Sequence, residues 1–501
     1  MSKKTLKIIT YLYLMIPIAI FIVGWVKIQF ALFPMVFLVV LLLKKVLEKE
    51  EKERMIDKKA CMIIFVIIMG ICFLGGIGGM FYQSSDWHYR NAIFRDLVNK
   101  DWPVFYENAD AALSYYIGIW MVPAMMGKAI LSLAGADLAW RVANVALWFW
   151  CATGITLTIL WLVKDFQPKN LRKIFLIMFL FLGFSGLDFI GVFLQGSIES
   201  INEMHLEWWA SYFQYSSMMT QIFWVFNQSI VAWLITVMFI QEKNVKQYLF
   251  LILLCFTYSP LPFLGLIPLM GVRGIKYLIQ AIQEKKISQF VKEVFSIENV
   301  LALLAIFPIY SLYYGNNSAI QTGSGLHIIE EALNKNGIKV WLEFYLLEVG
   351  IYGILLWKSY KKNEIYLAAL IALMIVPFIG IGLEYDFSMR VSIPALIVIN
   401  YYFIQWMIEI LKEEKISSFK ELWNRDTIQL KLVIACCVFV LGFITPFVEV
   451  NRGIWMVKKE KRMQLVADDV VTLEGKETDE SLNFVCVHPR ENSKFFQYLA
   501  K

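Results

Sequence analysis

The stretch CMIIFVIIMGICFLGGIGGMF, residues 61–81, carries no charged side chain along its whole length. About twenty apolar residues are enough for a helix to cross the roughly 30 Å hydrocarbon core of a bilayer. The rest of the chain has the same character, since 59% of its 501 residues are hydrophobic and only 18% are charged. Soluble proteins carry about 25% charged residues. We therefore predict an all-α polytopic membrane protein located in the cell membrane.

Thirteen apolar segments of this kind follow one another, and no internal repeat is visible among them. They cover roughly residues 7–26, 27–43, 60–81, 111–134, 139–163, 171–190, 220–240, 248–271, 299–315, 340–358, 365–383, 393–412 and 431–450.

Linkers rich in lysine and arginine, such as residues 44–59, mark the cytoplasmic side. With these linkers on one side, we expect two of the segments not to cross; the alternative is that all thirteen cross. Segment 111–134 contains Lys128 and a central Pro123, and segment 248–271 is interrupted by the sequence YSPLP. Broken backbone at membrane depth is tolerated only where protein or a cavity surrounds it. We predict about 11 to 13 transmembrane helices, with these two segments as re-entrant or juxtamembrane elements.

This topology divides the chain into three parts. Residues 1–59 form a transmembrane hairpin and its cytoplasmic linker, residues 60–450 a polytopic core, and residues 451–501 a short extracytoplasmic tail. The N-terminal MSKKTLK leads into an apolar run without a small-residue cleavage site, so we expect a retained first span and a cytoplasmic N-terminus. The core is expected to expose outer loops at residues 82–110, 191–219, 316–338 and 384–392.

The charge distribution and the cysteine positions indicate which partners and cofactors to expect. The net charge of +6 comes from lysines and arginines gathered in the linkers, a pattern that sets topology and does not indicate a nucleic-acid partner. Six of the seven cysteines lie in apolar blocks, with only Cys486 in the polar tail. This distribution predicts neither a disulfide framework nor a metal site.

The ionisable residues that we single out as candidate site residues lie mainly in the outer loops. The first loop contains Asp86, His88 and Arg90 in the sequence SSDWHYR, and the loop 191–219 contains His205, Glu207 and Trp208. A later loop contains Asp386 and Arg390, whose spacing of four residues would place them on one helix face, with the aspartate holding the guanidinium in place. Asp188 lies at the outer end of segment 171–190. Charges beside spans often mark only the interface, and Trp208 also suits an aromatic belt. Ionisable groups at membrane depth, however, usually face a cavity or a partner.

These residue types suit the transfer of a hydrophilic group from a lipid carrier. A carboxylate can act as general base on an acceptor hydroxyl, and the planar fork of arginine matches a phosphate. Aromatic faces pack on the apolar side of a sugar ring or on a polyprenyl chain. No nucleotide-binding motif is present, so an activated lipid donor would have to supply the energy.

With these residues the chain resembles the integral-membrane glycosyltransferases of the GT-C superfamily. The resemblance implies a catalytic acid in the first large outer loop, matched by Asp86, and a second acid at the outer end of a later helix, matched by Asp188. The segment LSYYIGIWMVPAMMGK resembles the juxtamembrane element that follows the acidic loop in that superfamily. The chain departs from the pattern in two places: Asp86 is followed by Trp87 and not by a second acid, and the hairpin 7–43 precedes the acidic loop.

The resemblance implies a glycosyltransferase that moves a sugar from a polyprenyl-phosphate carrier to a glycan or lipid acceptor at the outer face. The alternatives are a transporter or flippase of lipid-linked saccharides, and a surface-polysaccharide polymerase or ligase. Asp86 and His88 are also two candidate ligands for a divalent cation. The predicted catalytic residues are Asp86 and Asp188, and the predicted substrate-binding residues are His88, Arg90, Lys128, His205, Glu207, Trp208, Asp386 and Arg390. Asp86, Asp188, Glu207 and Arg390 are expected to line one outward-facing cavity.

Overall fold

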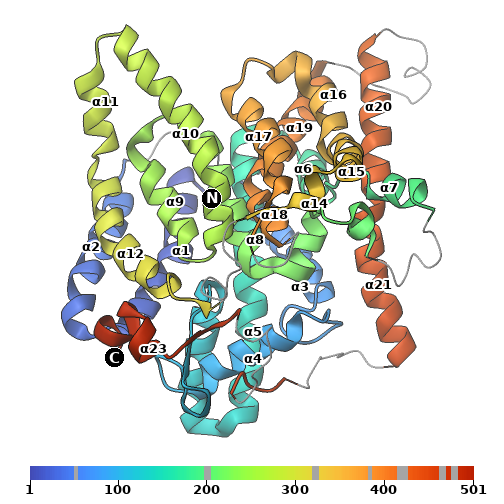
Figure 1. The fold of residues 1–501 in the computed structure, drawn as a ribbon. Coiled ribbons are helices and arrows are strands. Elements are labelled where there is room, and N and C mark those ends of the chain that lie inside the picture. The colour runs from blue at the N-terminus through green and yellow to red at the C-terminus, as the bar shows by residue number, and fades with distance from the viewer. Residues whose placement is uncertain are drawn as a thin grey trace.

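The chain folds into a bundle of apolar helices, as the sequence predicts (Figure 1). The computed structural model describes residues 1–49, 55–196, 205–318, 327–381, 386–413, 427–461, 470–474 and 483–501. Within those ranges, nine helical stretches are long and apolar enough to cross a membrane. They are Lys3–Trp25, Ile28–Leu47, Gly118–Phe166, Met218–Gln241, Pro260–Gln283, Ile287–Tyr314, Lys335–Tyr360, Ile393–Leu411 and Leu430–Glu460. The protein is an all-α polytopic membrane protein.

Individual elements begin and end as follows. The first helices are α1 (Lys3–Trp25), α2 (Ile28–Leu47), α3 (Lys58–Leu74), α4 (Trp87–Asn99), α5 (Met121–Phe166), α6 (Leu171–Leu182), α7 (Asp188–Leu194), α8 (Met218–Gln241), α9 (Tyr248–Phe256) and α10 (Pro260–Gln283). They are followed by α11 (Ile287–Val294), α12 (Ile297–Tyr314), α14 (Glu330–Leu333), α15 (Lys335–Tyr345), α16 (Ile351–Tyr360), α17 (Glu364–Ile375), α18 (Asp386–Val391), α19 (Ile393–Glu413), α20 (Thr427–Gly442), α21 (Ile444–Glu460) and α23 (Pro489–Asn492). Short single-turn helices are η1 (Glu107–Ala109), η2 (Gly118–Trp120), η3 (Leu206–Ala210), η4 (Val245–Gln247), η5 (Leu346–Gly350), η6 (Val376–Phe378) and η8 (Phe495–Leu499).

The two segments predicted not to cross are both broken. Helix α5 has non-helical backbone at Gly135, so the part of segment 111–134 that is helical forms a separate arm before the long apolar part of α5. Helices α9 and α10 are separated by a break at residues 257–259. Arg273 of α10 donates to the carbonyl oxygens of Phe239 and Ile240 at the end of α8. The single turn η4 follows from the same end of α8. The chain therefore runs away from this end in α9, turns at residues 257–259 and returns to the same end in α10.

Two predicted spans are shorter than expected. The helix in segment 60–81 stops at Leu74, because Gly76, Gly78 and Gly79 adopt positive φ, a conformation that turns the chain and that glycine alone adopts without strain. Segment 171–190 is split, with α6 ending at Leu182 and α7 beginning at Asp188.

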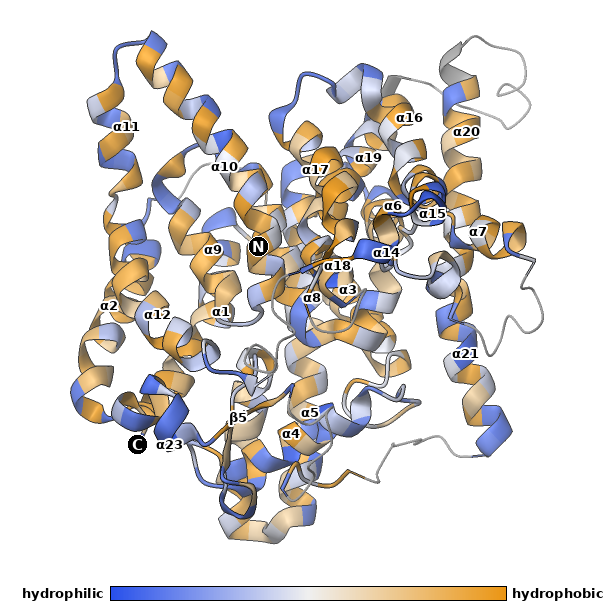
Figure 2. Ribbon diagram, viewed as in Figure 1, coloured by the Kyte–Doolittle hydropathy of each residue, from blue (hydrophilic) through white to orange (hydrophobic). Residues whose placement is uncertain are grey.

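The C-terminal tail folds back onto the first loop. Strand β5 (Val485–Val487) pairs antiparallel with β2 (Ala111–Leu113), which in turn pairs with β1 (Phe105–Tyr106). A second short sheet joins β3 (His327–Ile328) to β4 (Ile379–Gly380). The tail begins later than predicted, since α21 runs ten residues beyond position 450, to Glu460. The first loop and the tail thus lie at the same end of the bundle, as predicted, while the assignment of that end to the outer face stays a prediction. Hydrophilic residues gather at this end in α23 and in the lower part of α21 (Figure 2).

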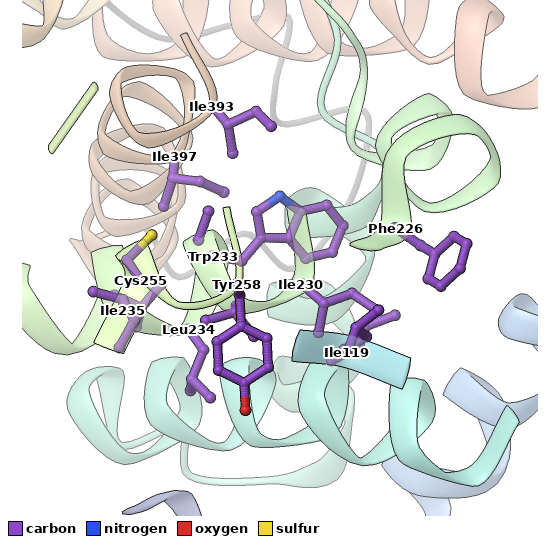
Figure 3. Packing of buried hydrophobic residues seen from close by; sticks show 14 of the residues in the cluster. Ile119, Phe226, Ile230, Trp233, Leu234, Ile235, Cys255, Tyr258, Ile393 and Ile397 are labelled. Carbon is purple, nitrogen blue, oxygen red and sulfur yellow. The ribbon is translucent and has the colours of Figure 1, made fainter. Parts of the chain in front are cut away.

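Helix α8 forms the centre of the apolar core. Nearly all its residues are buried, and Figure 3 shows side chains of η2, α8, α9 and α19 meeting around Trp233. The Trp233 indole nitrogen donates to Gln221 Oε1 at 2.6 Å, which satisfies this buried donor inside the core. The backbone of α8 departs from helical φ/ψ at Val225. The turns of α8 before this break contact the groups of side chains described in the next section.

Candidate functional site

Two aspartate–arginine pairs stand at the end of the bundle that holds the first loop. At the start of α4, Arg90 Nη2 lies 2.8 Å from Asp86 Oδ2, and in α18 Arg390 Nη1 lies 2.6 Å from Asp386 Oδ1. Both pairs are separated by four residues, so one helical turn brings each aspartate beside its arginine. Each arginine side chain is at most 10% exposed, while Asp86 is 41% and Asp386 32% exposed. The pairing of Asp386 with Arg390 is the contact predicted from the sequence.

The two pairs meet at two tyrosines. The rings of Tyr115 and Tyr116 lie 3.7 Å apart between their centroids, and the charges of Arg90 and Arg390 act on both hydroxyls. Burial raises the pKa of the Tyr116 hydroxyl, and the two guanidinium groups oppose this rise. The Tyr116 oxygen also accepts a hydrogen bond from Gln228 Nε2 of α8 at 3.0 Å. We name Asp86, Arg90, Tyr115, Tyr116, Asp386 and Arg390 the arginine–tyrosine site.

Each of the two arginines keeps a nitrogen that the described residues do not satisfy. These atoms are Arg90 Nη1 and Arg390 Nε, both buried. A buried donor without a partner costs about 1–3 kcal/mol, and more when it is charged, so such atoms are rarely left unsatisfied. Since both guanidinium groups act on the same pair of tyrosines, these two nitrogens are candidates to bind an anionic ligand.

Aromatic side chains from three parts of the chain enclose this site. Trp87 stacks on Phe226 with ring centroids 4.9 Å apart, and its indole nitrogen donates to the Phe223 carbonyl oxygen at 3.2 Å. Phe484 of the tail packs on Tyr89 at 5.3 Å and on Tyr115 at 4.9 Å. The start of α4 is therefore held by α8 on one side and by the tail on the other.

A second group of charges is buried around His205. Its Nδ1 lies 2.7 Å from Glu449 Oε1 of α21, and its Nε2 lies 3.5 Å from Glu207 Oε2 of η3. Burial alone would lower the pKa of His205, but the charges and hydrogen bonds of Glu449 and Glu207 outweigh burial and raise that pKa to about 10. Arg452 Nη2, 2.6 Å from Glu449 Oε2, adds a second cation.

Asp188 joins this second group through Glu348 of η5. Its carboxylate accepts hydrogen bonds from Ser185 Oγ at 3.1 Å and from Thr445 Oγ1 at 2.9 Å. The Glu348 carboxyl lies close enough for its charge to act on Asp188. We name Asp188, His205, Glu207, Glu348, Glu449 and Arg452 the buried carboxylate cluster.

Comparison of the chain with models of protein families, with curated proteins and with solved structures returns no match. The function has to be inferred from the geometry of these two groups of side chains.

The predicted site residues divide between the two groups. Asp86 and Arg390 belong to the arginine–tyrosine site, whereas Asp188 and Glu207 belong to the buried carboxylate cluster, so the expectation of one shared set is only partly met. The first turns of α8 lie between them: Phe223 binds Trp87 on one side, and the Trp224 indole nitrogen donates to Glu449 Oε2 at 3.0 Å on the other. The splitting of segment 171–190 turns Asp188 inward, toward α21 and η5.

Three further predicted substrate-binding residues are Lys128, Trp208 and His88. Lys128 donates to the Lys100 carbonyl oxygen and lies over the Trp102 ring, at 5.8 Å from the ring centroid. Trp208 is 54% exposed and meets the His205 ring edge to face at 4.9 Å. His88 follows Asp86 in the first turn of α4. Among the described residues, no three His, Cys, Asp or Glu side chains are arranged to hold a metal ion, so Asp86 and His88 have no third ligand there.

Glu348, Glu449, Tyr115 and Tyr116 were not among the residues predicted from the sequence. For the two glutamates a signal was present, because each lies inside an apolar segment, 340–358 or 431–450, where a charge requires a partner. No such signal marks the tyrosines, since aromatic residues are common near the ends of membrane helices.

Proposed function

We propose that this protein is a membrane glycosyltransferase, similar to those of the GT-C superfamily, that transfers a sugar from a polyprenyl-phosphate carrier. The observation that carries the proposal is the arginine–tyrosine site, in which Arg90 and Arg390 each keep a buried nitrogen that the described residues do not satisfy. A phosphate group offers several acceptor oxygens and a negative charge, which two guanidinium groups are suited to bind.

In this proposal Asp86 acts as general base. Its side chain is the more exposed carboxylate of the two ion pairs, so an acceptor hydroxyl can reach it. The acceptor oxygen attacks the anomeric carbon of the donor while Asp86 takes its proton, and the bond from that carbon to the phosphate oxygen breaks. The lipid phosphate leaves with the electron pair, and Arg90 and Arg390 stabilise the charge that develops on it.

Asp188 suits a positioning role better than contact with substrate. Its carboxyl is buried and already bound by Ser185 and Thr445, and the Glu348 carboxyl lies close to it. Through Glu348 and Trp209, whose indole nitrogen lies 3.4 Å from Glu348 Oε1, it would hold η3 and its exposed Trp208 in place. Trp208 then offers an aromatic face to a sugar ring.

The proposal is tested by a transfer assay with purified protein and a panel of polyprenyl-phosphate sugars. Wild-type protein should form product with at least one donor, and Asp86→Asn should bind that donor but turn it over far more slowly. Wild-type turnover by Asp86→Asn would remove the base assignment.

The second candidate function is a transporter or flippase of lipid-linked saccharides. It is favoured by two features, the re-entrant α9–α10 pair and the ionisable residues Glu348 and Glu449 inside candidate spans, both of which are common in transporters. Absence of transfer with every donor, together with translocation of a fluorescent lipid-linked saccharide in proteoliposomes, would favour this function over transfer.

A further inference from the structure

A basic cavity lies at the N-terminal end of α1, where α5 and α8 also end. Its volume is about 730 Å³, within the range of roughly 300–1,000 Å³ that is typical of ligand sites. Six lysines line it: Lys3, Lys4, Lys7, Lys49, Lys164 and Lys243. They face only three carboxylates in the described lining, and the cavity shares no lining residue with the arginine–tyrosine site or the buried carboxylate cluster.

The carboxylates in the lining are already engaged. Glu48 accepts from Lys7 at 3.1 Å and from the buried Lys45 at 2.8 Å, and Asp165 accepts from the Tyr401 hydroxyl. Glu242 Oε1 accepts from the backbone nitrogen of Lys243 at 3.1 Å. The described lining therefore keeps an excess of positive charge.

Helix α1 adds to this excess. Lys3, Lys4 and Lys7 occupy its first two turns, where the helix dipole is positive and cations are unfavourable. An anion in the cavity would offset both the dipole and the lysine charges. Lysines of this kind bind phosphate as point charges.

A smaller, mainly apolar cavity adjoins the basic one. Its volume is about 270 Å³, and it shares Lys164 and Gln167 with the basic cavity. Seven of its twelve described lining residues are apolar, among them Ile56, Val163 and Leu171, and Asp57, Lys169 and Asn170 add polar groups. A ligand that fits both cavities has a phosphate at one end and a hydrocarbon chain at the other.

We propose that these two cavities bind an anionic phospholipid, with its phosphate among the lysines and an acyl chain beginning along Val163 and Leu171. The proposal is independent of the transferase function, because it uses none of the residues assigned to transfer. A soluble phosphate ester would share the phosphate contacts but would leave the apolar cavity empty, and this difference separates the two sources.

The test uses the purified full-length protein in a non-ionic detergent, with native mass spectrometry and the thermal unfolding midpoint as readouts. The probes are phosphatidylglycerol, phosphatidylcholine and inorganic phosphate at equal concentrations. We expect phosphatidylglycerol alone to be retained and to raise the midpoint. Equal retention of the two lipids, or an equal midpoint shift with inorganic phosphate, would overturn the proposal.

The matched variants change two lysines each. Lys4→Gln with Lys243→Gln should weaken phosphatidylglycerol binding about 30-fold, since each lysine near an anionic lipid contributes on the order of a factor of five. Lys358→Gln with Lys361→Gln, which alters exposed lysines outside both cavities, should bind as wild type does. If the first pair does not fold, the single change of the exposed Lys243 is used and should still weaken binding several-fold. An equal loss of phosphatidylglycerol binding in the two double variants would contradict the lysine site. Unchanged binding in the Lys4/Lys243 double variant, or in the Lys243 single variant, would contradict it as well.

Discussion

The arginine–tyrosine site and the buried carboxylate cluster lie on two sides of the first turns of α8, and their carboxylates differ in exposure. Both groups contain an arginine with a buried nitrogen that the described residues do not satisfy, namely Arg90, Arg390 and Arg452. In the first group the aspartates are partly exposed. In the second group the Glu449 carboxylate is 1% exposed and is already bound by His205, Trp224 and Arg452.

This difference distinguishes residues that are suited to bind a ligand from residues that stabilise the fold. Unsatisfied buried donors cost free energy, and a ligand that satisfies them recovers it. A charge whose partners are all present gains nothing from a ligand, and removing one of its partners leaves an uncompensated buried charge. We therefore expect changes in the arginine–tyrosine site to alter turnover and donor binding, and changes in the buried carboxylate cluster to alter stability.

The largest effect is expected from Asp86→Asn. Loss of a positioned general base lowers rates by about 10²–10⁴-fold, so turnover in the transfer assay should fall by that range with little change in donor affinity. Asp101→Asn is the matched control, because Asp101 is a fully exposed aspartate in the same loop. An equal loss of turnover in the control would show that the loop, and not the carboxylate of Asp86, matters.

Breaking the buried carboxylate cluster should cost stability. Glu449→Gln removes the carboxylate that pairs with Arg452 and one of the two that pair with His205, and the loss of one partner from a buried ion pair costs about 3–5 kcal/mol. The free energy of unfolding, measured by denaturation with sodium dodecyl sulfate in mixed micelles, should fall accordingly. Glu460→Gln, an exposed change on the same helix, should leave it unaltered. A variant of Glu449 that is stable but inactive would make this cluster part of the chemistry and end the division proposed above.

Arg390→Lys should weaken donor binding more than it lowers turnover. Lysine keeps the charge but loses the planar fork, and hydrogen bonds to a charged group are worth about 1.5–3 kcal/mol. The KM for the donor should rise roughly ten- to a hundredfold, and Arg90→Lys should act in the same direction. Arg95→Lys serves as control, since the Arg95 guanidinium lies over the Trp140 ring. A donor KM equal to that of wild type in both variants would remove phosphate binding from this site.

A pH dependence of stability caused by His205 is expected as well. Its pKa of about 10 in the folded protein exceeds the value of about 6.5 for an unperturbed histidine. The stabilisation is therefore fully present below about pH 6.5 and is lost as the pH rises toward 10, by at most about 1.4 kcal/mol per pH unit. Thermal unfolding between pH 7 and pH 10 should show this slope in wild type. His205→Gln should flatten it, and an unchanged slope in that variant would assign it to another group.

The sequence was informative where one local rule decides the outcome. The apolar segments predicted the membrane helices, the YSPLP sequence predicted the break between α9 and α10, and the spacing of Asp386 and Arg390 predicted their ion pair. Each of these follows from the chain within a few residues. The sequence was less informative at Leu74 and Leu182, where helices stop inside continuous apolar runs because glycine turns and tertiary contacts end them.

Membership of the all-α polytopic class was determined by the sequence alone, because transfer of long uncharged segments into hydrocarbon depends on composition and length. The division of the charged residues into two groups was decided only by the tertiary structure. Asp188 contacts Thr445, 257 residues away, and Glu449 contacts His205, 244 residues away, and no local pattern specifies such pairs. Their physical cause is that each buried charge needs a partner, and packing of the helices around α8 determines which partner lies within reach.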